Sequence, residues 1–362
     1  MTRILVWFWS GGGGGSQFAA HLARRLTNRF GADRVALSMR ADDPTIESAE
    51  ARGVRVLRAD VISDRRRPLQ TLASLARGRR VLRDHMNAAG ADVVCLAMNF
   101  AAAAPLSLAL DRPLVYCAHD PEPHPGDFAV GMQRVTQAHL LRRAAVVVAL
   151  SEHAASRLAV QNVSRAKLQV AALSSVFEPV ASPSPLQSAP VRLLMIGRMM
   201  EYKGLALLAD ALILLASRDD WELSIVGRGP ALQADRFAHI PQVRVRESWL
   251  SESEIDALID AHDIVLAPYT EASQSGVVSQ SLARGRPIVA TPVGALSEQL
   301  DDGAAGWIAK AADPAAFAAA IASALDDPEA RKRKAATAHA LAETAWTSPT
   351  WDWLSELNVS AR

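Results

Sequence analysis

The chain has few of the features that mark membrane, secreted or disordered proteins. Its 362 residues include only two cysteines, and its 19 prolines and 20 glycines are ordinary for this length. No apolar run approaches the ~18 residues that a membrane-spanning helix needs. The apolar start, residues 4–9, is too short for a signal peptide and leads into glycines rather than a cleavage site. With 50% hydrophobic residues and a mean hydropathy of +0.07, the chain is predicted to be a globular cytoplasmic protein of two domains.

The two cysteines carry no expected redox or metal chemistry. Cys95 and Cys117 each lie inside an apolar, strand-like run, and no histidines accompany them at metal-binding spacing. This pattern predicts reduced core residues rather than a disulfide bridge or a zinc site.

The formal net charge of +1 hides two oppositely charged halves. Residues 1–190 carry 23 basic and 15 acidic side chains, a net charge of +8, and the remainder carries −7. The basic excess gathers at residues 65–67 and at Arg77, Arg79, Arg80 and Arg83, which indicates a helix face that meets an anionic partner such as a membrane surface. A solvated helix face is the equal alternative. Nucleic acid is not expected as a partner, because no aromatic interleaving, zinc-finger spacing or recognition helix accompanies the arginines.

Short apolar runs rich in β-branched residues alternate with longer helical patterns along the whole chain. This alternation is typical of βαβ units and a parallel sheet. The expected strands are residues 4–9, 34–38, 54–57, 92–97, 113–118 and 146–150 in the first half, and 191–196, 222–226, 243–246, 264–267 and 287–290 in the second.

A stretch with three prolines and three serines, residues 181–190, separates the two halves and is predicted to be a linker. We therefore expect an α/β protein of two Rossmann-like, doubly wound domains, residues 1–180 and 191–345, followed by a C-terminal segment, residues 346–362. If the domains face each other, the carboxyl ends of both sheets line a central cleft that binds the ligands.

A run of glycines, Gly11–Gly15, follows the first expected strand and precedes a helix. A phosphate or a sugar can approach such a turn closely at Gly13 and Gly14. The spacing does not fit a dinucleotide-binding motif, because Ser16 stands where a third glycine or alanine is required and no acidic residue ends the second expected strand. The alternative is a turn that merely packs its helix close to its strand.

The segment CAHDPEPHPGD, residues 117–127, follows an expected strand and so lies at the ligand-binding edge. A metal site formed by His119, Asp120 and His124 is not expected, because the intervening prolines exclude a helix that aligns them and no second ligand cluster is evident. We predict that His119 is a site residue that hydrogen-bonds a hydroxyl near the reacting group, and that Asp120 and His124 contact an acceptor. A loop histidine bonded to a backbone group is the alternative.

The second half has two cations in a strand-to-helix turn. Arg198 follows Gly197 at the end of an expected strand, and Lys203 precedes a helix. At these positions both side chains can converge on a diphosphate that also faces the positive end of the helix. The equal alternative is that both cations are ordinary exposed side chains that bind no ligand.

Three further segments predict contacts to a nucleotide. Gly227 and Arg228 form a second glycine-containing strand end, and Trp249 and Leu250 follow a third strand, where Trp249 covers a base or serves as a packing residue. Ser275 begins a helix whose hydroxyls and first amides form another anion site. The anion site is expected at Ser275 and Gly276, and the residues of this segment expected to contact the nucleotide are Glu271, Ser275, Gly276, Val277 and Gln280.

Three sequence blocks in this order resemble family 4 of the glycosyltransferases, which are retaining enzymes of the GT-B architecture. The blocks are GRMMEYKG from Gly197, IVGRGP from Ile225, and SQSGVVSQSLARGRPIVATPVG from Ser273, with the glycine-rich turn and His119–Asp120 upstream. The resemblance covers nearly the whole chain and is strongest in the second half.

The resemblance implies metal-independent transfer of a hexosyl group from a nucleoside diphosphate sugar, with UDP or GDP as the nucleotide and no cofactor. The donor is held by the second domain, and the acceptor, a glycan or a lipid-linked precursor of a polysaccharide, by the first. Arg198 and Lys203 match the residues that neutralise the diphosphate, and His119 matches a histidine beside the reacting sugar. The segment 346–362, with Trp351 and Trp353, matches a last helix that crosses back to the first domain. Such an enzyme is expected in the cytoplasm or at the inner face of the membrane.

One departure from the family pattern concerns its pair of glutamates. These positions fall on Ala272 and Gln280, and Glu271 misses the first by one residue. The amide of Gln280 can still hydrogen-bond ribose hydroxyls. Two other functions stay open: a nucleotide-sugar epimerase or phosphorylase of the same architecture, and a non-catalytic partner subunit that binds nucleotide.

Overall fold

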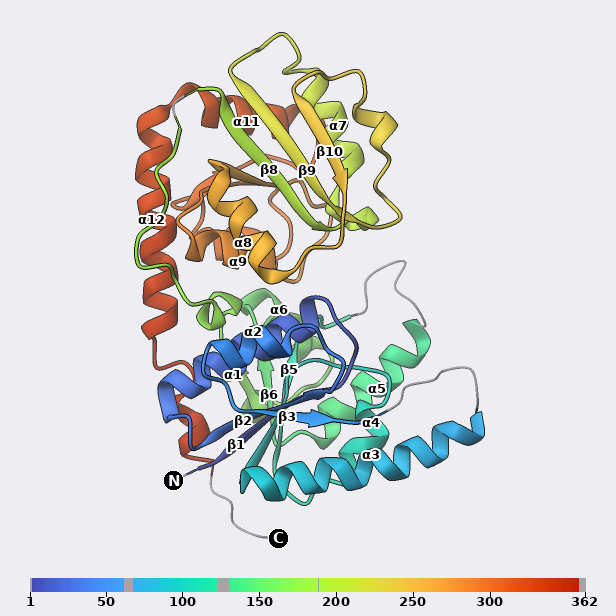
Figure 1. Ribbon diagram of the computed structural model, residues 1–362. Coiled ribbons are helices and arrows are strands. Elements are labelled where there is room, and N and C mark those ends of the chain that lie inside the picture. The colour runs from blue at the N-terminus through green and yellow to red at the C-terminus, as the bar shows by residue number, and fades with distance from the viewer. Residues whose placement is uncertain (1, 62–67, 123–129, 188, 358–362) are drawn as a thin grey trace. The chain divides into compact units, whose positions relative to one another are not determined.

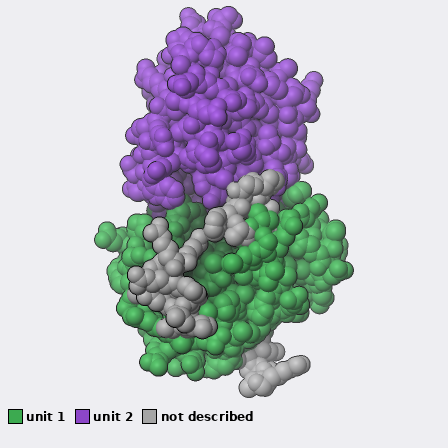
Figure 2. Space-filling model, turned by 90° about the vertical axis from the view of Figure 1, so that its right-hand side faces the viewer, with its two compact units in different colours: residues 1–172, 348–362 green, residues 173–347 purple. Residues whose placement is uncertain are grey.

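The computed structural model describes residues 2–61, 68–122, 130–187 and 189–357. The chain forms two compact units, residues 1–172 with 348–362, and residues 173–347, which Figure 2 shows in green and purple.

The first unit is built on a parallel sheet of seven strands, in the order β3-β2-β1-β4-β5-β6-β7. Its strands are β1 (Ile4–Phe8), β2 (Val35–Arg40), β3 (Val56–Ala59), β4 (Val93–Leu96), β5 (Leu114–Ala118), β6 (Val146–Ala149) and β7 (Leu168–Val170). Its helices are α1 (Gly14–Phe30), α2 (Ile46–Ala51), α3 (Pro68–Ala89), α4 (Ala103–Ser107), α5 (Val130–Arg143) and α6 (Glu152–Val160). Helices α1 and α2 cover one face of the sheet, and α3 and α4 cover the other (Figure 1).

The second unit is built on a parallel sheet of six strands, in the order β10-β9-β8-β11-β12-β13. Its strands are β8 (Val191–Arg198), β9 (Trp221–Arg228), β10 (Val243–Glu247), β11 (Ile264–Ala267), β12 (Ile288–Ala290) and β13 (Gly306–Ile308). Its helices are α7 (Leu205–Ile213), α8 (Glu252–Ala261), α9 (Gly276–Ala283), α10 (Leu296–Gln299), α11 (Pro314–Asp326) and α12 (Pro328–Thr347), with short 3-10 turns η2 (Leu173–Val176), η3 (Glu201–Lys203) and η4 (Ala234–Phe237).

The predicted fold class, two doubly wound parallel sheets, is confirmed. Each of the eleven expected ranges overlaps a strand, because strands covered by helices on both faces are continuous apolar runs. Strands β7 and β13 were not predicted, since each has only three residues and lies at a sheet edge. Strands β8 and β9 extend two residues beyond the expected ends, so Arg198 and Arg228 belong to strands.

The chain changes units at residues 172–173 and 347–348 rather than in the proline-rich stretch 181–190. That stretch is fixed to the second unit: Arg286 Nη1 donates to the Ser184 carbonyl at 2.7 Å, and the Gln187 amide donates to Asp263 Oδ1 at 2.7 Å. Proline content therefore marks an irregular segment that hydrogen-bonds to the second unit, and not the boundary itself.

The end of the chain returns to the first unit from residue 348. It does so as a short 3-10 turn, η5 (Asp352–Ser355), in place of the expected helix. Arg29 Nε in α1 donates to Asp352 Oδ1 at 2.6 Å, and Trp351 is fully buried.

Both cysteines are free and buried, as predicted. Burial raises the pKa of the Cys95 thiol to about 12 and raises that of Cys117 as well, so both remain protonated thiols at neutral pH. Among the described residues, no helix combines the length and the apolar character needed to cross a membrane.

Candidate functional site

In the second unit, the strand order reverses between β8 and β11. Ligands of doubly wound sheets bind beside the carboxyl ends of the strands at such a reversal. Arg198 ends β8 and Lys203 lies in the loop that follows it, and the loop after β11 carries Tyr269 and Ser275. The topology therefore brings the two predicted anion-binding segments to the same edge of one sheet.

The ends of β8 and β9 lie side by side. Gly197 pairs with Gly227, and Arg198 pairs with Arg228, in parallel register. A Cβ atom at Gly227 would lie 1.9 Å from the Gly197 carbonyl oxygen, so only glycine permits this close approach of the two strands. Both arginine side chains are exposed, and Arg228 forms a loose ion pair with Glu247 (Nε to Oε1, 3.6 Å).

Lys203 is buried, with only 9% of its surface exposed, which excludes ordinary surface exposure as its explanation. Its Nζ atom lies 3.8 Å from the ring centroid of Tyr269 and 5.4 Å from that of Tyr202. The two rings stand nearly perpendicular to each other. An ammonium group over a buried aromatic face is held by the negative charge of the ring face, and this contact strengthens as water is removed.

The backbone around Lys203 is fixed just as closely. Gly204, which follows it, has φ +70°, and a Cβ atom there would lie 1.8 Å from the Pro268 carbonyl oxygen. The Thr270 amide donates to the Tyr202 carbonyl at 2.8 Å. The loops after β8 and β11 are thus joined by backbone as well as by side chains.

Tyr269 links Lys203 to the start of α9. The ring of Tyr269 is 2% exposed, and its hydroxyl lies 3.2 Å from Ser275 Oγ. Ser275 caps α9 by accepting from the Val278 amide at 3.4 Å. The start of α9 also lies beside the end of β8, because a Cβ atom at Gly197 would contact Val277 Cγ2 at 3.5 Å.

The start of α9 differs in one respect from the predicted anion site. The Ser275 hydroxyl and amide do not point freely outward, because the amide donates to Gln299 Oε1 at 2.8 Å and the hydroxyl serves as the cap. The groups that remain for an anion are the first amides of the helix, Gly276 and Val277, which have no acceptor within a helix that starts there. Gln299 was not predicted as part of this site, because it reaches Ser275, 24 residues earlier in the sequence, only through the tertiary fold.

Gln280 is directed to α8 rather than to the strand ends. Its side chain is 8% exposed, and its Nε2 atom donates to Asp256 Oδ1 at 2.8 Å. Asp256 also pairs with Arg284 Nη1 at 3.3 Å. Glu271 is exposed, and Ala272, at the first family glutamate position, is buried.

Trp249 is 60% exposed, which excludes the alternative that it packs in the core of its unit, whereas Leu250 is buried. An exposed tryptophan after β10 remains suited to cover a flat ligand group.

In the first unit, the glycine turn between β1 and α1 leaves space for a ligand at Gly12 and Gly14. Gly12 and Gly13 have φ +66° and +82°, and Cβ atoms at Gly12 and Gly14 would meet no atom within 4 Å. The packing alternative holds only for Gly15, where a Cβ atom would lie 2.5 Å from Phe8.

An acidic residue that lies three positions after the end of β2 supports this turn. Asp43 follows β2, and its Oδ2 atom accepts from the Ser16 hydroxyl at 2.6 Å and from the Gly12 amide at 3.2 Å. Because β2 runs to Arg40, two residues beyond the expected end, Asp43 was not recognised in the sequence. Its carboxylate serves to hold the turn.

His119 follows β5 and stacks edge-on against Phe18 of α1, with ring centroids 4.2 Å apart. Burial lowers the pKa of its imidazole to about 4, although Asp120 and a hydrogen bond with the Ala97 backbone act in the opposite direction. The imidazole is therefore neutral at physiological pH. Asp120 is half-buried, and His124 lies outside the described residues.

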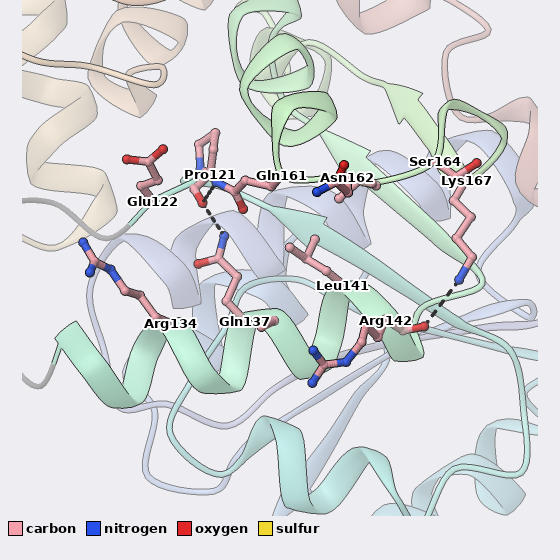
Figure 3. A pocket seen from close by; sticks show the side chains of 12 residues that line it. Pro121, Glu122, Arg134, Gln137, Leu141, Arg142, Gln161, Asn162, Ser164 and Lys167 are labelled. Atoms are coloured by element: carbon pink, nitrogen blue, oxygen red, sulfur yellow. Dashed lines mark hydrogen bonds between the residues drawn. The ribbon is translucent and has the colours of Figure 1, made fainter.

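A cavity of about 680 Å³ opens beside the loop that follows His119 and Asp120 (Figure 3). It lies between α5 and residues 161–167 of the same unit. Its lining residues are Pro121, Glu122, Arg134, Gln137, Ala138, Leu141, Arg142, Gln161, Asn162, Val163, Ser164 and Lys167. No cluster of three or more potential metal ligands occurs among the described residues.

Comparisons with known proteins agree with this architecture. Residues 190–327 match the family "Glycosyl transferases group 1", and residues 13–173 match the "Glycosyl transferase 4-like domain". The structure of Anabaena Alr3699/HepE in complex with UDP and glucose superposes with a TM-score of 0.75 at 19% identity, over 99% of this chain and 100% of that one.

Two curated relatives match parts of the chain. The D-inositol 3-phosphate glycosyltransferase of Corynebacterium glutamicum is 32% identical over 149 residues, 38% of this chain and 36% of that protein. The lipopolysaccharide core biosynthesis mannosyltransferase LpsB of Rhizobium meliloti is 30% identical over 219 residues, 57% of this chain and 62% of that protein. The chain thus spans less than two thirds of the length of these relatives.

The two family matches cover both units, one in each, and the fold is that of the GT-B proteins, with two Rossmann-like domains. The chain therefore belongs to the group 1 glycosyl transferases, family 4 of the glycosyltransferases.

Proposed function

We propose that the chain transfers a hexosyl group from a nucleoside diphosphate sugar to an acceptor hydroxyl, with retention of configuration and without a metal ion. The observation that carries this proposal is the placement of Lys203, a buried ammonium held against Tyr269 at the sheet edge where Arg198 and the start of α9 also lie. Buried cations need a partner of opposite charge, and a diphosphate supplies it.

The chemistry assigned to these residues is electrostatic. When the bond between the sugar C1 and the β-phosphate oxygen breaks, negative charge grows on the diphosphate. Lys203, Arg198 and the amides of Gly276 and Val277 stabilise this charge in fixed positions. The acceptor oxygen bonds to C1 on the face that the diphosphate leaves, and the acceptor proton passes to the departing β-phosphate. The reaction then requires no strong protein base.

In the first unit, we propose that His119 forms a hydrogen bond close to the reacting sugar. Because the imidazole is neutral, it accepts or donates a hydrogen bond without bringing a charge near the sugar. We assign it to a hydroxyl beside the reacting centre, and we assign the acceptor to the first unit at Asp120. Gly13 and Gly14 of the glycine turn are assigned to the donor. His124 is part of the same proposal.

The first donor to test is UDP-glucose, because the similar Anabaena structure holds UDP and glucose. Binding of UDP to the folded chain raises its stability by RT ln(1 + [L]/Kd), about 2.7 kcal/mol at a hundredfold excess over Kd. A thermal-shift series with UDP, GDP and their sugars identifies the base, and no shift with any of them would contradict the donor site. For acceptors, the named relatives suggest lipid-linked and lipopolysaccharide glycans.

Incubation with the donor alone distinguishes an epimerase from a transferase, and incubation of the product with inorganic phosphate identifies a phosphorylase. A transferase leaves the sugar unchanged apart from slow hydrolysis, an epimerase converts it, and a phosphorylase cleaves the product with inorganic phosphate. Binding of nucleotide without turnover for any acceptor favours a non-catalytic partner subunit.

We also propose that α3 brings the first unit to an anionic membrane surface. Arg80 and Arg83 are exposed on this helix, and Arg79 Nη2 joins α3 to α4 through the Pro105 carbonyl at 3.3 Å. Leu108, which follows α4, is 61% exposed. Arg77 is paired with Asp60, and the arginines at 65–67 lie outside the described residues.

A further inference from the structure

The cavity beside α5 has fixed walls. Gln137 Nε2 donates to the carbonyls of Asp120 and Pro121, and Gln161 Nε2 donates to the same Pro121 carbonyl, each at 2.8 Å (Figure 3). At the other end, Lys167 Nζ donates to the Ala144 carbonyl at 3.1 Å. The cavity is therefore formed before any ligand enters, which lowers the entropic cost of binding.

Two arginines along one wall are available for a ligand. Arg134 and Arg142 lie eight residues apart on α5, about 12 Å along the helix axis, and both line the cavity. Within the described part of the chain, neither side chain forms an ion pair. The one acidic residue of the lining, Glu122, is neutralised by Arg157 at 2.5 Å.

The rest of the lining combines a few polar side chains with an apolar surface of larger area. Asn162 and Ser164 stand opposite α5, and Ala138, Leu141 and Val163 supply the aliphatic part. Such a lining suits a sugar chain, because each ring carries hydroxyl groups around an apolar face.

We propose that this cavity binds the extended part of an anionic glycan, with carboxylate or phosphate groups that contact Arg134 and Arg142. The inference rests on the proposed function, since it assigns the remote part of the acceptor. The cavity begins at Pro121, directly after His119 and Asp120, so a chain whose reacting end lies at that loop continues along α5. The enzyme is then specific for acidic acceptors and uses the charge along the acceptor to orient it.

Binding of oligosaccharides without any donor tests the proposal. The probes are a hexamer of galacturonic acid, a hexamer of glucose as its neutral counterpart, and a hexamer of glutamic acid. Calorimetry at low and high salt is expected to show binding of the acidic glycan alone, weaker at high salt. Arg134→Gln with Arg142→Gln is expected to weaken it at least tenfold.

The matched control is Arg244→Gln with Arg246→Gln, which removes two exposed charges from β10 of the second unit, a strand that does not line the cavity. Equal loss in the control and the test variant, or no binding of the acidic glycan, would overturn the proposal. Tighter binding of the glutamate peptide would overturn it in favour of a protein partner. A UDP thermal shift measured on the same variants reports the donor site separately, so failure of the proposed function is distinguishable from failure of this site.

Discussion

At the scale of single residues, the cations of the second unit carry the proposed chemistry. Interactions that strengthen in the transition state lower kcat when they are lost. We expect Arg198→Ala and Lys203→Ala each to lower kcat at least about a hundredfold, since one positioned stabilising group contributes roughly 2.7 to 4 kcal/mol. Lys203 is buried, so Lys203→Met, which keeps the apolar stem, is the better test of charge alone. Normal turnover in folded Arg198→Ala and Lys203→Met would place the diphosphate elsewhere.

Tyr269 is expected to act through Lys203. Tyr269→Phe keeps the ring and loses only the hydroxyl contact to Ser275, so kcat/KM should stay within about threefold of the wild type. Tyr269→Leu removes the aromatic face, whose contact with a desolvated ammonium contributes about 2 kcal/mol, so kcat/KM should fall at least about tenfold. In a Lys203→Met background the same change should have no further effect on kcat/KM. An additional fall there would show that Tyr269 acts independently of the cation.

The contact of Gln280 with Asp256 changes what its substitution is expected to do. Gln280→Leu removes one hydrogen-bond donor from the half-buried Asp256 carboxylate, so the free energy of unfolding should fall by about 1 kcal/mol while KM for the nucleotide sugar stays unchanged. Chemical denaturation and donor kinetics on the same sample measure both. A raised KM with unchanged stability would restore the role predicted from sequence, a hydrogen bond to ribose.

At the scale of secondary-structure elements, α3 is the part of the first unit that we expect at a membrane. Each basic residue near an anionic surface contributes roughly 1 kcal/mol. Arg80→Glu with Arg83→Glu should abolish co-sedimentation with anionic liposomes at low salt, and Arg244→Glu with Arg246→Glu on β10 should not. Equal binding of the wild type to neutral and anionic vesicles would exclude the electrostatic contact.

The elements also show how far the sequence predicts the site. Buried parallel strands and glycine turns follow local patterns, so the sheets, Gly197, Gly227 and the open glycine turn are visible in the sequence. Contacts between loops that are distant in sequence are not. The Tyr269 ring over Lys203 and the Asp43 carboxylate on the glycine turn both depend on which strands are neighbours. The direction of Gln280 depends on the packing of α8 against α9.

At the scale of the whole molecule, His119 makes stability depend on pH. Its pKa is about 4 in the folded chain and about 6.5 when unfolded. Between these values the unfolded chain binds a proton that the folded chain does not, so the free energy of unfolding falls as the pH decreases from 6.5 to 4. Urea denaturation at pH 7 and pH 4.5 should show a smaller decrease for His119→Asn than for the wild type or for the exposed His153→Asn. An equal decrease in all three would mean that His119 titrates freely.

The return of the chain to the first unit has a consequence for synthesis. The seven strands of that unit leave the ribosome early, but Trp351 and Asp352 leave it only after the entire second unit has been made. During this interval the place that Trp351 fills is open, and Arg29 lacks its carboxylate partner. The first unit is thus complete only after residues 348–357 have been made, and until then the site that Trp351 covers stays exposed.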